Sequence, residues 1–198
     1  MEQVQPSENK ANFWQDILSY LKDACYMIAF VVLIFSFCVR IVVVSGGSMF
    51  ATLYDGDYLL VMDRNICGEL EQGDIVVAAM DRFRNGAPIV KRVIATEGQT
   101  VDINFREGIV YVDGVAMEEP YINEKTHTPQ GMEFPLTVEE GCLFLMGDNR
   151  NDSTDSRNPA IGQVDTREIL GRAFFLVIPG THGGQEPFQI GRIGGFGS

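Results

Sequence analysis

A serine that follows two glycines is the first feature of this sequence with the means for covalent chemistry. Ser48 stands in the segment SGGSMFATL, residues 45–53. Glycines let the backbone turn sharply, so the serine hydroxyl is exposed and the N–H groups of Gly46, Gly47 and Ser48 can point at a developing oxyanion. Ordinary turns share this composition, so the segment by itself leaves both a nucleophile and a plain turn open.

A lysine among aliphatic residues is the second feature. Lys91 lies in the segment IVKRVI, residues 89–94, which we expect to form a strand with Lys91 and Arg92 on opposite faces. Desolvation lowers the pKa of a lysine from about 10.4 by several units, which would make Lys91 a usable general base. The competing interpretation is a wet strand edge where Lys91 pairs with a carboxylate.

A run of short polar and charged residues is the third feature. The segment GDNRNDSTDSR, residues 147–157, follows an apolar strand and suits a loop held by its own hydrogen bonds and ion pairs. Calcium binding is the alternative, but the three aspartates do not fall at EF-hand spacing and the two arginines would oppose a cation. We therefore expect an internally bonded loop.

The composition gives metal and cofactor chemistry little support. The 198 residues include only two histidines, His127 and His182, and Cys67 lies too far from Cys142 for a CxxC site. A disulfide between these two cysteines is left open. We expect no metal and no cofactor.

The acidic charge balance argues against nucleic acid as a partner. The chain has 27 acidic and 15 basic residues, a formal net charge of −12, and no basic stripe with interleaved aromatic residues. A surface of this sign repels phosphate backbones. We expect neither DNA nor RNA binding.

The elements that must position these residues are mostly strands. Beyond Val44 no long helical period occurs, and Asp113-Gly114 predicts a hairpin turn. Residues 118–134 are expected to be a loop and residues 190–198 a flexible glycine-rich tail. The expected strands are residues 57–62, 74–79, 89–95, 101–104, 109–112, 142–146 and 173–178. Together they predict a mainly β, mostly antiparallel domain.

An apolar run precedes this domain. Residues 24–39 carry no charge, and the run continues to residue 44 if Arg40 snorkels toward lipid headgroups. Such a stretch spans about 30 Å as a helix, so residues 24–44 are expected to be an uncleaved transmembrane anchor. Residues 1–23 would form an N-terminal segment with an interfacial helix. A buried core helix is the less favoured alternative, because no polar face interrupts the run.

Read together, these segments resemble one known family. SGGSMFATL, then GDIVVA (residues 73–78) followed by IVKRVI, then GDNRNDSTDSR occur in the order and spacing of type I signal peptidases. The segment LGRAFFLVIP, residues 170–179, is also similar. The resemblance implies the β-rich signal-peptidase fold. It also implies a membrane-bound serine endopeptidase that cleaves signal peptides from exported preproteins after Ala-x-Ala-like sites, through a Ser/Lys dyad.

The resemblance assigns roles to individual positions. Ser48 corresponds to the nucleophile and Lys91 to the general base. Many members carry a serine at the position of Gly46, whose hydroxyl joins the oxyanion hole, and a proline at the position of Ala51. The hole is therefore expected to rest on backbone donors. The positions that orient the lysine or support the site correspond to Ser153, Asp155, Arg157, Asp148 and Arg92.

The resemblance also implies a topology that the charges leave undecided. Lys10 and Lys22 before the apolar run are balanced by Arg40 and Arg64 after it. With Ser48 held just beyond a single span, the N-terminus would be cytoplasmic and residues 45–189 an extracytoplasmic catalytic domain. Signal peptides and the lipid bilayer would be its partners. A specialised Ser/Lys maturase of pilin or conjugation proteins, or a non-catalytic pilus-assembly factor of the same fold, are the alternatives.

Overall fold

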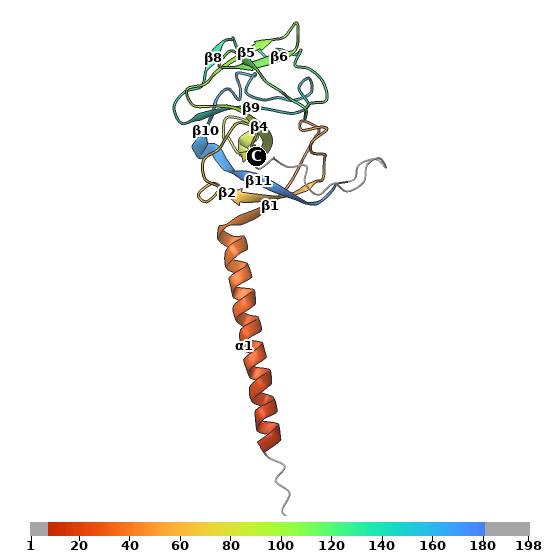
Figure 1. The fold of residues 1–198 in the computed structure, drawn as a ribbon, viewed down its shortest axis with the longest axis vertical. Helices are drawn as coiled ribbons and strands as arrows, with labels where there is room; N and C mark the ends of the chain where they lie inside the picture. Colours follow the sequence, from red (N-terminus) through yellow and green to blue (C-terminus); the bar gives the residue numbers. More distant parts are fainter. Residues whose placement is uncertain (1–7, 181–198) are drawn as a thin grey trace, which may run out of the picture. The chain divides into compact units, whose positions relative to one another are not determined.

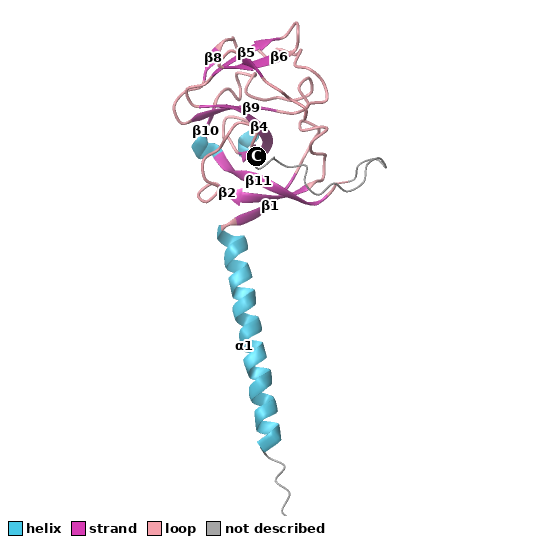
Figure 2. Cartoon of the chain, viewed as in Figure 1, coloured by secondary structure: helices cyan, strands magenta, loops and turns pink. Residues whose placement is uncertain are grey.

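The chain consists of a helical unit up to Val39 and a β domain from Arg40 onward, in a computed structural model that describes residues 8–180. Figure 1 traces both units along the sequence, and Figure 2 shows one long helix and a domain of strands and loops. The prediction of a mainly β domain with one N-terminal apolar helix is confirmed. The glycine-rich segment 190–198 lies outside the described residues.

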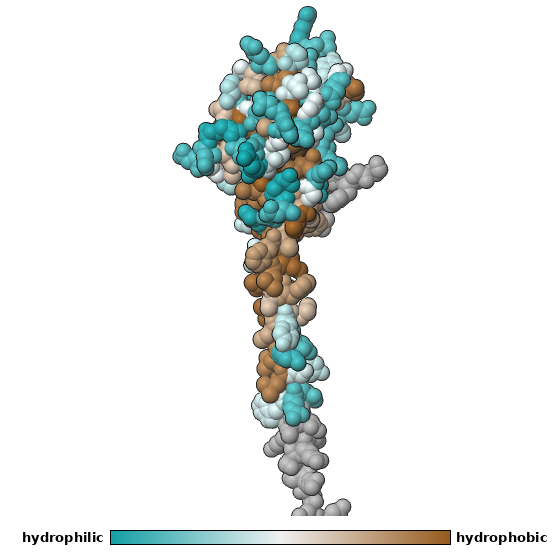
Figure 3. Space-filling model, turned by 90° about the vertical axis from the view of Figure 1, so that its left-hand side faces the viewer, coloured by the Kyte–Doolittle hydropathy of each residue, from teal (hydrophilic) through white to brown (hydrophobic). Residues whose placement is uncertain are grey.

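Helix α1 spans Glu8–Phe37 and includes the region expected to form an interfacial helix. Its large apolar side chains are exposed, for example Trp14, Phe30 and Leu33. Figure 3 shows mostly apolar side chains along its C-terminal part, whereas hydrophilic ones occur among the apolar ones in its N-terminal half. The segment Phe13–Phe37 is long and apolar enough to cross a membrane. An exposed apolar helix of this length is suited to a lipid environment.

The C-terminal end of this helix corrects the sequence-based expectation. The helix was expected to continue to residue 44, but α1 ends at Phe37 and Val39–Val43 forms strand β1. Arg40, expected to snorkel toward headgroups, instead forms an ion pair with Asp63, with 2.7 Å between Nη2 and Oδ2. The β-branched residues of this segment suit a strand as well as a membrane helix, and a neighbouring strand is present to pair with them.

Two sheets build the β domain. The larger has the strand order β1-β2-β11-β3-β4-β9-β10 and the smaller β7-β6-β5-β8, and the pairings from β2 to β10 and within the smaller sheet are antiparallel. The strands after β1 are β2 (Tyr58–Asp63), β3 (Ile75–Ala78), β4 (Ile89–Thr96), β5 (Thr100–Asn104), β6 (Ile109–Val112), β7 (Val115–Ala116), β8 (Leu136–Thr137), β9 (Cys142–Met146), β10 (Val164–Asp165) and β11 (Ile169–Ile178). All seven predicted strands are present.

The turns also follow the sequence. Asp113 and Gly114 have φ angles of 53° and 78° and join β6 to β7 in the predicted hairpin. Residues 118–134 contain no helix or strand, as expected for a loop. Two-residue strands such as β8 and β10 contain too few residues to show a period, so the sequence does not reveal them.

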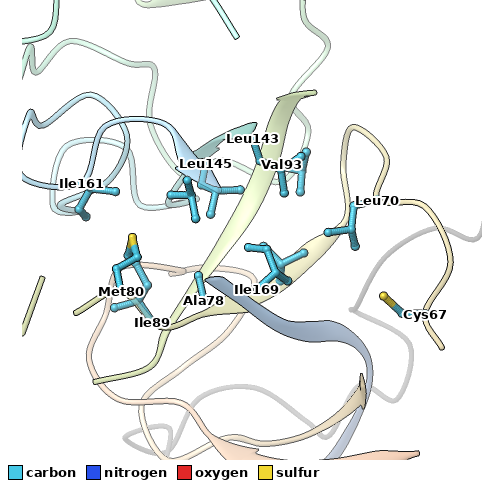
Figure 4. Close-up of a cluster of buried hydrophobic side chains, with 12 residues drawn as sticks. Cys67, Leu70, Ala78, Met80, Ile89, Val93, Leu143, Leu145, Ile161 and Ile169 are labelled. Atoms are coloured by element: carbon cyan, nitrogen blue, oxygen red, sulfur yellow. The ribbon is translucent and has the colours of Figure 1, made fainter. Parts of the chain in front are cut away.

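The interior strands are buried on both faces. Along β3, Ile75 and Val77 enter one apolar cluster, while Val76 and Ala78 enter another. Figure 4 shows the second cluster, where side chains from β3, β4, β9 and β11 converge. Strand β4, which carries the candidate lysine, is thus enclosed between β3 and β9. Cys67 packs in this cluster, and it and Cys142 are free thiols, so the disulfide left open by the sequence does not form.

Candidate active site

The serine lies in a tight turn between β1 and β2, residues 45–53, which we call the nucleophile turn. Two core side chains fix this turn, because Met49 and Leu53 are 1% and 0% exposed. The N–H groups of Thr52 and Leu53 both donate to the Met49 carbonyl oxygen at 2.8 Å. Gly46 has a φ of +88°, a backbone conformation that side-chain-bearing residues rarely adopt. Ser48 itself is half-buried.

Lys91 lies against this serine. Its Nζ donates to Ser48 Oγ at 2.7 Å and to the Val90 carbonyl oxygen at 3.0 Å. The side chain is buried, and burial lowers the pKa of Lys91 to about 8, although the nearby Asp155 carboxylate acts in the opposite direction. The alternative of a wet strand edge with a carboxylate partner is wrong. Strand β4 is interior, and Lys91 forms no salt bridge within the described residues.

Arg92, the neighbour of the lysine, is held in an ion pair instead. Its Nε and Nη2 donate to the two Asp148 carboxylate oxygens at 2.8 and 2.6 Å. Thr52 Oγ1 donates to the same carboxylate at 2.5 Å, which ties the nucleophile turn to the polar loop. The Tyr121 ring lies under the guanidinium, 3.9 Å from its carbon to the ring centroid, a cation–π geometry. The two consecutive β4 residues therefore differ, because Lys91 contacts the serine hydroxyl whereas Arg92 forms an ion pair with a carboxylate.

The segment 147–157 is held partly by its own bonds, as the sequence predicts, and partly by ion pairs to Arg92 and Glu119 outside it. Arg157 makes two hydrogen bonds to Asp155, at 2.8 and 2.7 Å, and both side chains are fully buried. Arg150 does the same with Glu119, at 2.8 and 2.5 Å. We call these two pairs, together with Arg92 and Asp148, the arginine network. Asp155 also accepts from the Gly147 N–H at 3.0 Å, so the network holds the backbone beside Ser48.

Gly147 brings the loop into contact with the nucleophile turn. A Cβ atom at this position would lie 2.4 Å from the Ser48 carbonyl oxygen and 2.2 Å from Ser153 Oγ. Only glycine permits this approach. Ser48 and Ser153 therefore both lie against the side of Gly147 that a Cβ atom would occupy.

Ser153 is placed near the dyad but does not bond to it. Its hydroxyl oxygen is buried and has no hydrogen-bond partner among the described residues. The expected hydrogen bond to Lys91 is therefore not present in this structure. A buried hydroxyl without a partner costs about 1–3 kcal/mol, which is unusual in a well-packed loop and typical of a functional position.

The backbone donors of the nucleophile turn are not equivalent. The Gly46 N–H donates to Asp55 Oδ1 at 2.7 Å and is therefore occupied. Within residues 8–180 no group accepts a hydrogen bond from the N–H of Gly47 or Ser48. Ala51 lies in the same turn and is half-buried.

Some residues at this site carry no clear sequence signal. Tyr121 and Glu119 come from the irregular loop 118–134, and neither belongs to a recognisable motif. Burial raises the pKa of Tyr121 to about 12, so its ring contacts Arg92 as a neutral phenol. Asn149 and Thr52 lie inside the matched segments, but only the fold shows which groups they bond.

Comparison with known proteins gives a consistent result. The family described as "Signal peptidase, peptidase S26" matches residues 17–178. Signal peptidase I of Bacillus licheniformis is 33% identical over 87% of this chain and 93% of its own length. A probable signal peptidase I-1 of Synechocystis is 38% identical over 72% of each chain. A crystal structure of a signal peptidase I from Enterococcus faecalis matches with a TM-score of 0.44 and 30% identity, over 52% of this chain and 96% of that one.

Proposed function

This chain belongs to the signal peptidase family, peptidase S26, and from that premise we propose that Ser48 is its nucleophile and Lys91 its general base. Members of this family are serine endopeptidases that cleave signal peptides, and this chain is one of them. One observation carries the residue assignment. Lys91 Nζ lies 2.7 Å from Ser48 Oγ, and no carboxylate in the described part of the chain pairs with the lysine and holds its proton.

The proposed mechanism is acyl transfer. Neutral Lys91 takes the proton from Ser48 Oγ as that oxygen attacks the carbonyl carbon of the scissile peptide bond. The Ser48 N–H donates to the oxyanion that forms. The lysine ammonium then protonates the departing amine nitrogen, which leaves an ester on Ser48. A water molecule deprotonated by Lys91 hydrolyses this ester and regenerates the hydroxyl. The lysine thus takes the part that histidine has in the familiar triad.

The remaining predicted site residues have supporting roles in this proposal. Ser153 would accept a hydrogen bond from Lys91 Nζ once the amine becomes an ammonium, since its buried hydroxyl has no partner here. Asp155 and Arg157 hold the Gly147 backbone, and Asp148 and Arg92 connect that loop to Thr52. Gly46, whose N–H is bonded to Asp55, would shape the turn rather than donate to the oxyanion.

We propose that the substrates are membrane-inserted preproteins with Ala-x-Ala-like cleavage sites. Homologous signal peptidases and the apolar α1 indicate membrane anchoring. In this proposal α1 is the single span, the N-terminus is cytoplasmic and the β domain is extracytoplasmic. Ser48 follows the end of α1 by only eleven residues, which limits how far it can lie from the membrane. A substrate strand would then meet Ser48 close to the bilayer, where a signal peptide ends.

The decisive experiment uses the full chain in detergent micelles with a preprotein that carries an Ala-x-Ala site. We expect Ser48→Ala and Lys91→Ala each to lower cleavage by more than about 10³-fold, because each removes a group that acts at the reacting bond. Ser153→Ala is expected to slow cleavage without abolishing it. Mass spectrometry of the products identifies the bond that is cut.

Two exposed residues provide matched controls. Ser19→Ala on α1 and Lys125→Ala in the loop 118–134 remove the same kinds of side chain outside the site and should cleave like the unmodified chain. Retained cleavage by a folded Ser48 or Lys91 variant would refute the assignment. No cleavage by the unmodified chain would instead favour a non-catalytic assembly factor.

A further inference from the structure

We propose that Asn149 is a positioning residue that fixes the direction of the Ser48 N–H, the donor for the oxyanion. This inference rests on the proposed role of Ser48 as nucleophile. Asn149 donates two hydrogen bonds to carbonyl oxygens of the nucleophile turn. Its side-chain Nδ2 donates to the Gly47 carbonyl oxygen at 2.9 Å, and its backbone N–H donates to the Ser48 carbonyl oxygen at 3.0 Å.

Because the peptide bond is planar, the hydrogen bond from Asn149 to the Gly47 carbonyl oxygen also fixes the direction of the Ser48 N–H. The Gly47 carbonyl and the Ser48 N–H belong to the same peptide unit, and in a trans peptide they point in opposite directions. Holding the carbonyl oxygen therefore sets where the N–H points, which is away from Asn149. The Ser48 N–H has no acceptor within residues 8–180, so it is available to a substrate.

The sequence before Ser48 makes such a restraint necessary. Gly46 and Gly47 have wide conformational freedom, and a Cβ built at either position would meet no atom within 4 Å. Side-chain packing therefore does not hold this part of the turn. Among residues 8–180 the only other donor to the Gly47 oxygen is the Phe50 N–H at 3.1 Å, which belongs to the same turn and moves with it. Asn149 supplies the hydrogen bond from outside.

Asn149 is itself held firmly. It stands between Asp148 and Arg150, which are 0% and 1% exposed and form ion pairs with Arg92 and Glu119. The Asn149 side chain thus links the arginine network to the peptide unit that carries the oxyanion donor. In a chain with glycine at position 46, no serine hydroxyl is present there to act as a second donor, so the direction of the Ser48 N–H matters more.

The test measures cleavage by Asn149→Ala in the full chain in detergent micelles. Loss of an oxyanion donor lowers kcat by about 10²–10³-fold, so loss of its positioning should lower kcat by about 10–100-fold. KM should change less than about threefold, because the donor acts on the transition state. The pH midpoint of kcat/KM should stay that of the unmodified chain, since Lys91 keeps its surroundings. Asn149→Asp is the second variant, because an ionised carboxylate keeps the size but cannot donate to Gly47.

A pair of inhibitors and a neighbouring asparagine separate positioning from general disturbance. A peptide aldehyde forms a tetrahedral adduct with Ser48, so its affinity should fall with kcat, while the matching peptide alcohol should bind unchanged. Asn151→Ala is the control variant. Its side chain bonds the Lys125 carbonyl oxygen and the His127 N–H, away from the nucleophile turn, and it should keep kcat within about threefold.

The outcomes are distinct. A kcat within about twofold of the unmodified chain in both Asn149 variants would overturn the inference and leave the proposed function standing. Equal losses in Asn149→Ala and Asn151→Ala, or a parallel loss of peptide alcohol binding, would also overturn it, because they indicate a disturbed loop. Failure of the unmodified chain to cleave any preprotein would overturn the proposed function and this inference together.

Discussion

Lys91 and the arginine network are two regions that bury positive charge in opposite ways. Among the described side chains four cationic ones are at most 5% exposed, namely Lys91, Arg92, Arg150 and Arg157. Each arginine forms an ion pair with a carboxylate, whereas the lysine meets only hydroxyl and carbonyl oxygens. The paired cations have structural roles. The unpaired one has a lowered pKa of about 8, which fits it for proton transfer.

The difference teaches why the site uses both residue types. A guanidinium cannot lose its proton at any ordinary pH, so an arginine that is buried must be paired. An ammonium can lose its proton, so a lysine that is buried without a partner becomes a base. Removal of a carboxylate from the arginine network should therefore lower stability, whereas a carboxylate placed beside Lys91 should impair its action as a base.

The largest effect is expected from breaking a pair in the arginine network. Asp155→Ala leaves Arg157 buried and charged, and the free energy of unfolding should fall by about 3–5 kcal/mol. The measurement is denaturant unfolding of the full chain in detergent, followed by the circular dichroism of the strands. Tryptophan fluorescence does not report on this domain, because the single tryptophan, Trp14, lies in α1.

The matched control for this variant is Asp152→Ala, which removes an exposed carboxylate from the same loop. It forms no salt bridge within the described residues, so its effect should stay within about 0.5 kcal/mol. If Asp155→Ala and Asp152→Ala lower the free energy of unfolding by similar amounts, the buried ion pair contributes no more to stability than an exposed carboxylate.

The second-largest effect is a gain in the free energy of unfolding. Lys91→Met should raise the free energy of unfolding at pH 7 by about 3 kcal/mol, because burial of the ammonium lowers the pKa of Lys91 from 10.5 to about 8. Between pH 8 and 10.5 the unfolded chain still binds a proton that the folded chain has lost, so the original protein gains stability with rising pH. The advantage of the methionine variant should therefore shrink over that window.

Lys125→Met serves as the control, since Lys125 is exposed and its replacement should leave the unfolding curve unchanged at every pH. A Lys91→Met variant that is less stable than the original chain at pH 7 would contradict the lowered pKa of the lysine.

The smallest effect is the pH dependence of cleavage. Only neutral Lys91 accepts a proton, so kcat/KM should rise about tenfold between pH 6 and pH 7 and level off above pH 8. Initial rates at low substrate concentration from pH 6 to 10 measure this profile. A profile that levels off below pH 6 would show that another group, or a charged lysine, controls the reaction. Lys125→Met should leave the midpoint in place.

Much of the fold follows from local sequence. The strands with clear apolar alternation and the Asp113-Gly114 hairpin are where the sequence places them. The end of the apolar helix is the main error, because Val39 and residues 41–43 are apolar and β-branched and suit either environment. Pairing with β2, a contact with a distant segment, decided the outcome.

The sequence by itself pointed to the main residues of the candidate site. Ser48, Lys91 and the segment 147–157 were identifiable from their types and order, through a resemblance that the family match supports. Only the tertiary structure decided how each one is used. Lys91 meets Ser48 across 43 positions and Asn149 meets Gly47 across 102, and Arg92 takes Asp148 as its partner. Such pairings depend on strand register and loop packing, which bring together groups that no local pattern connects.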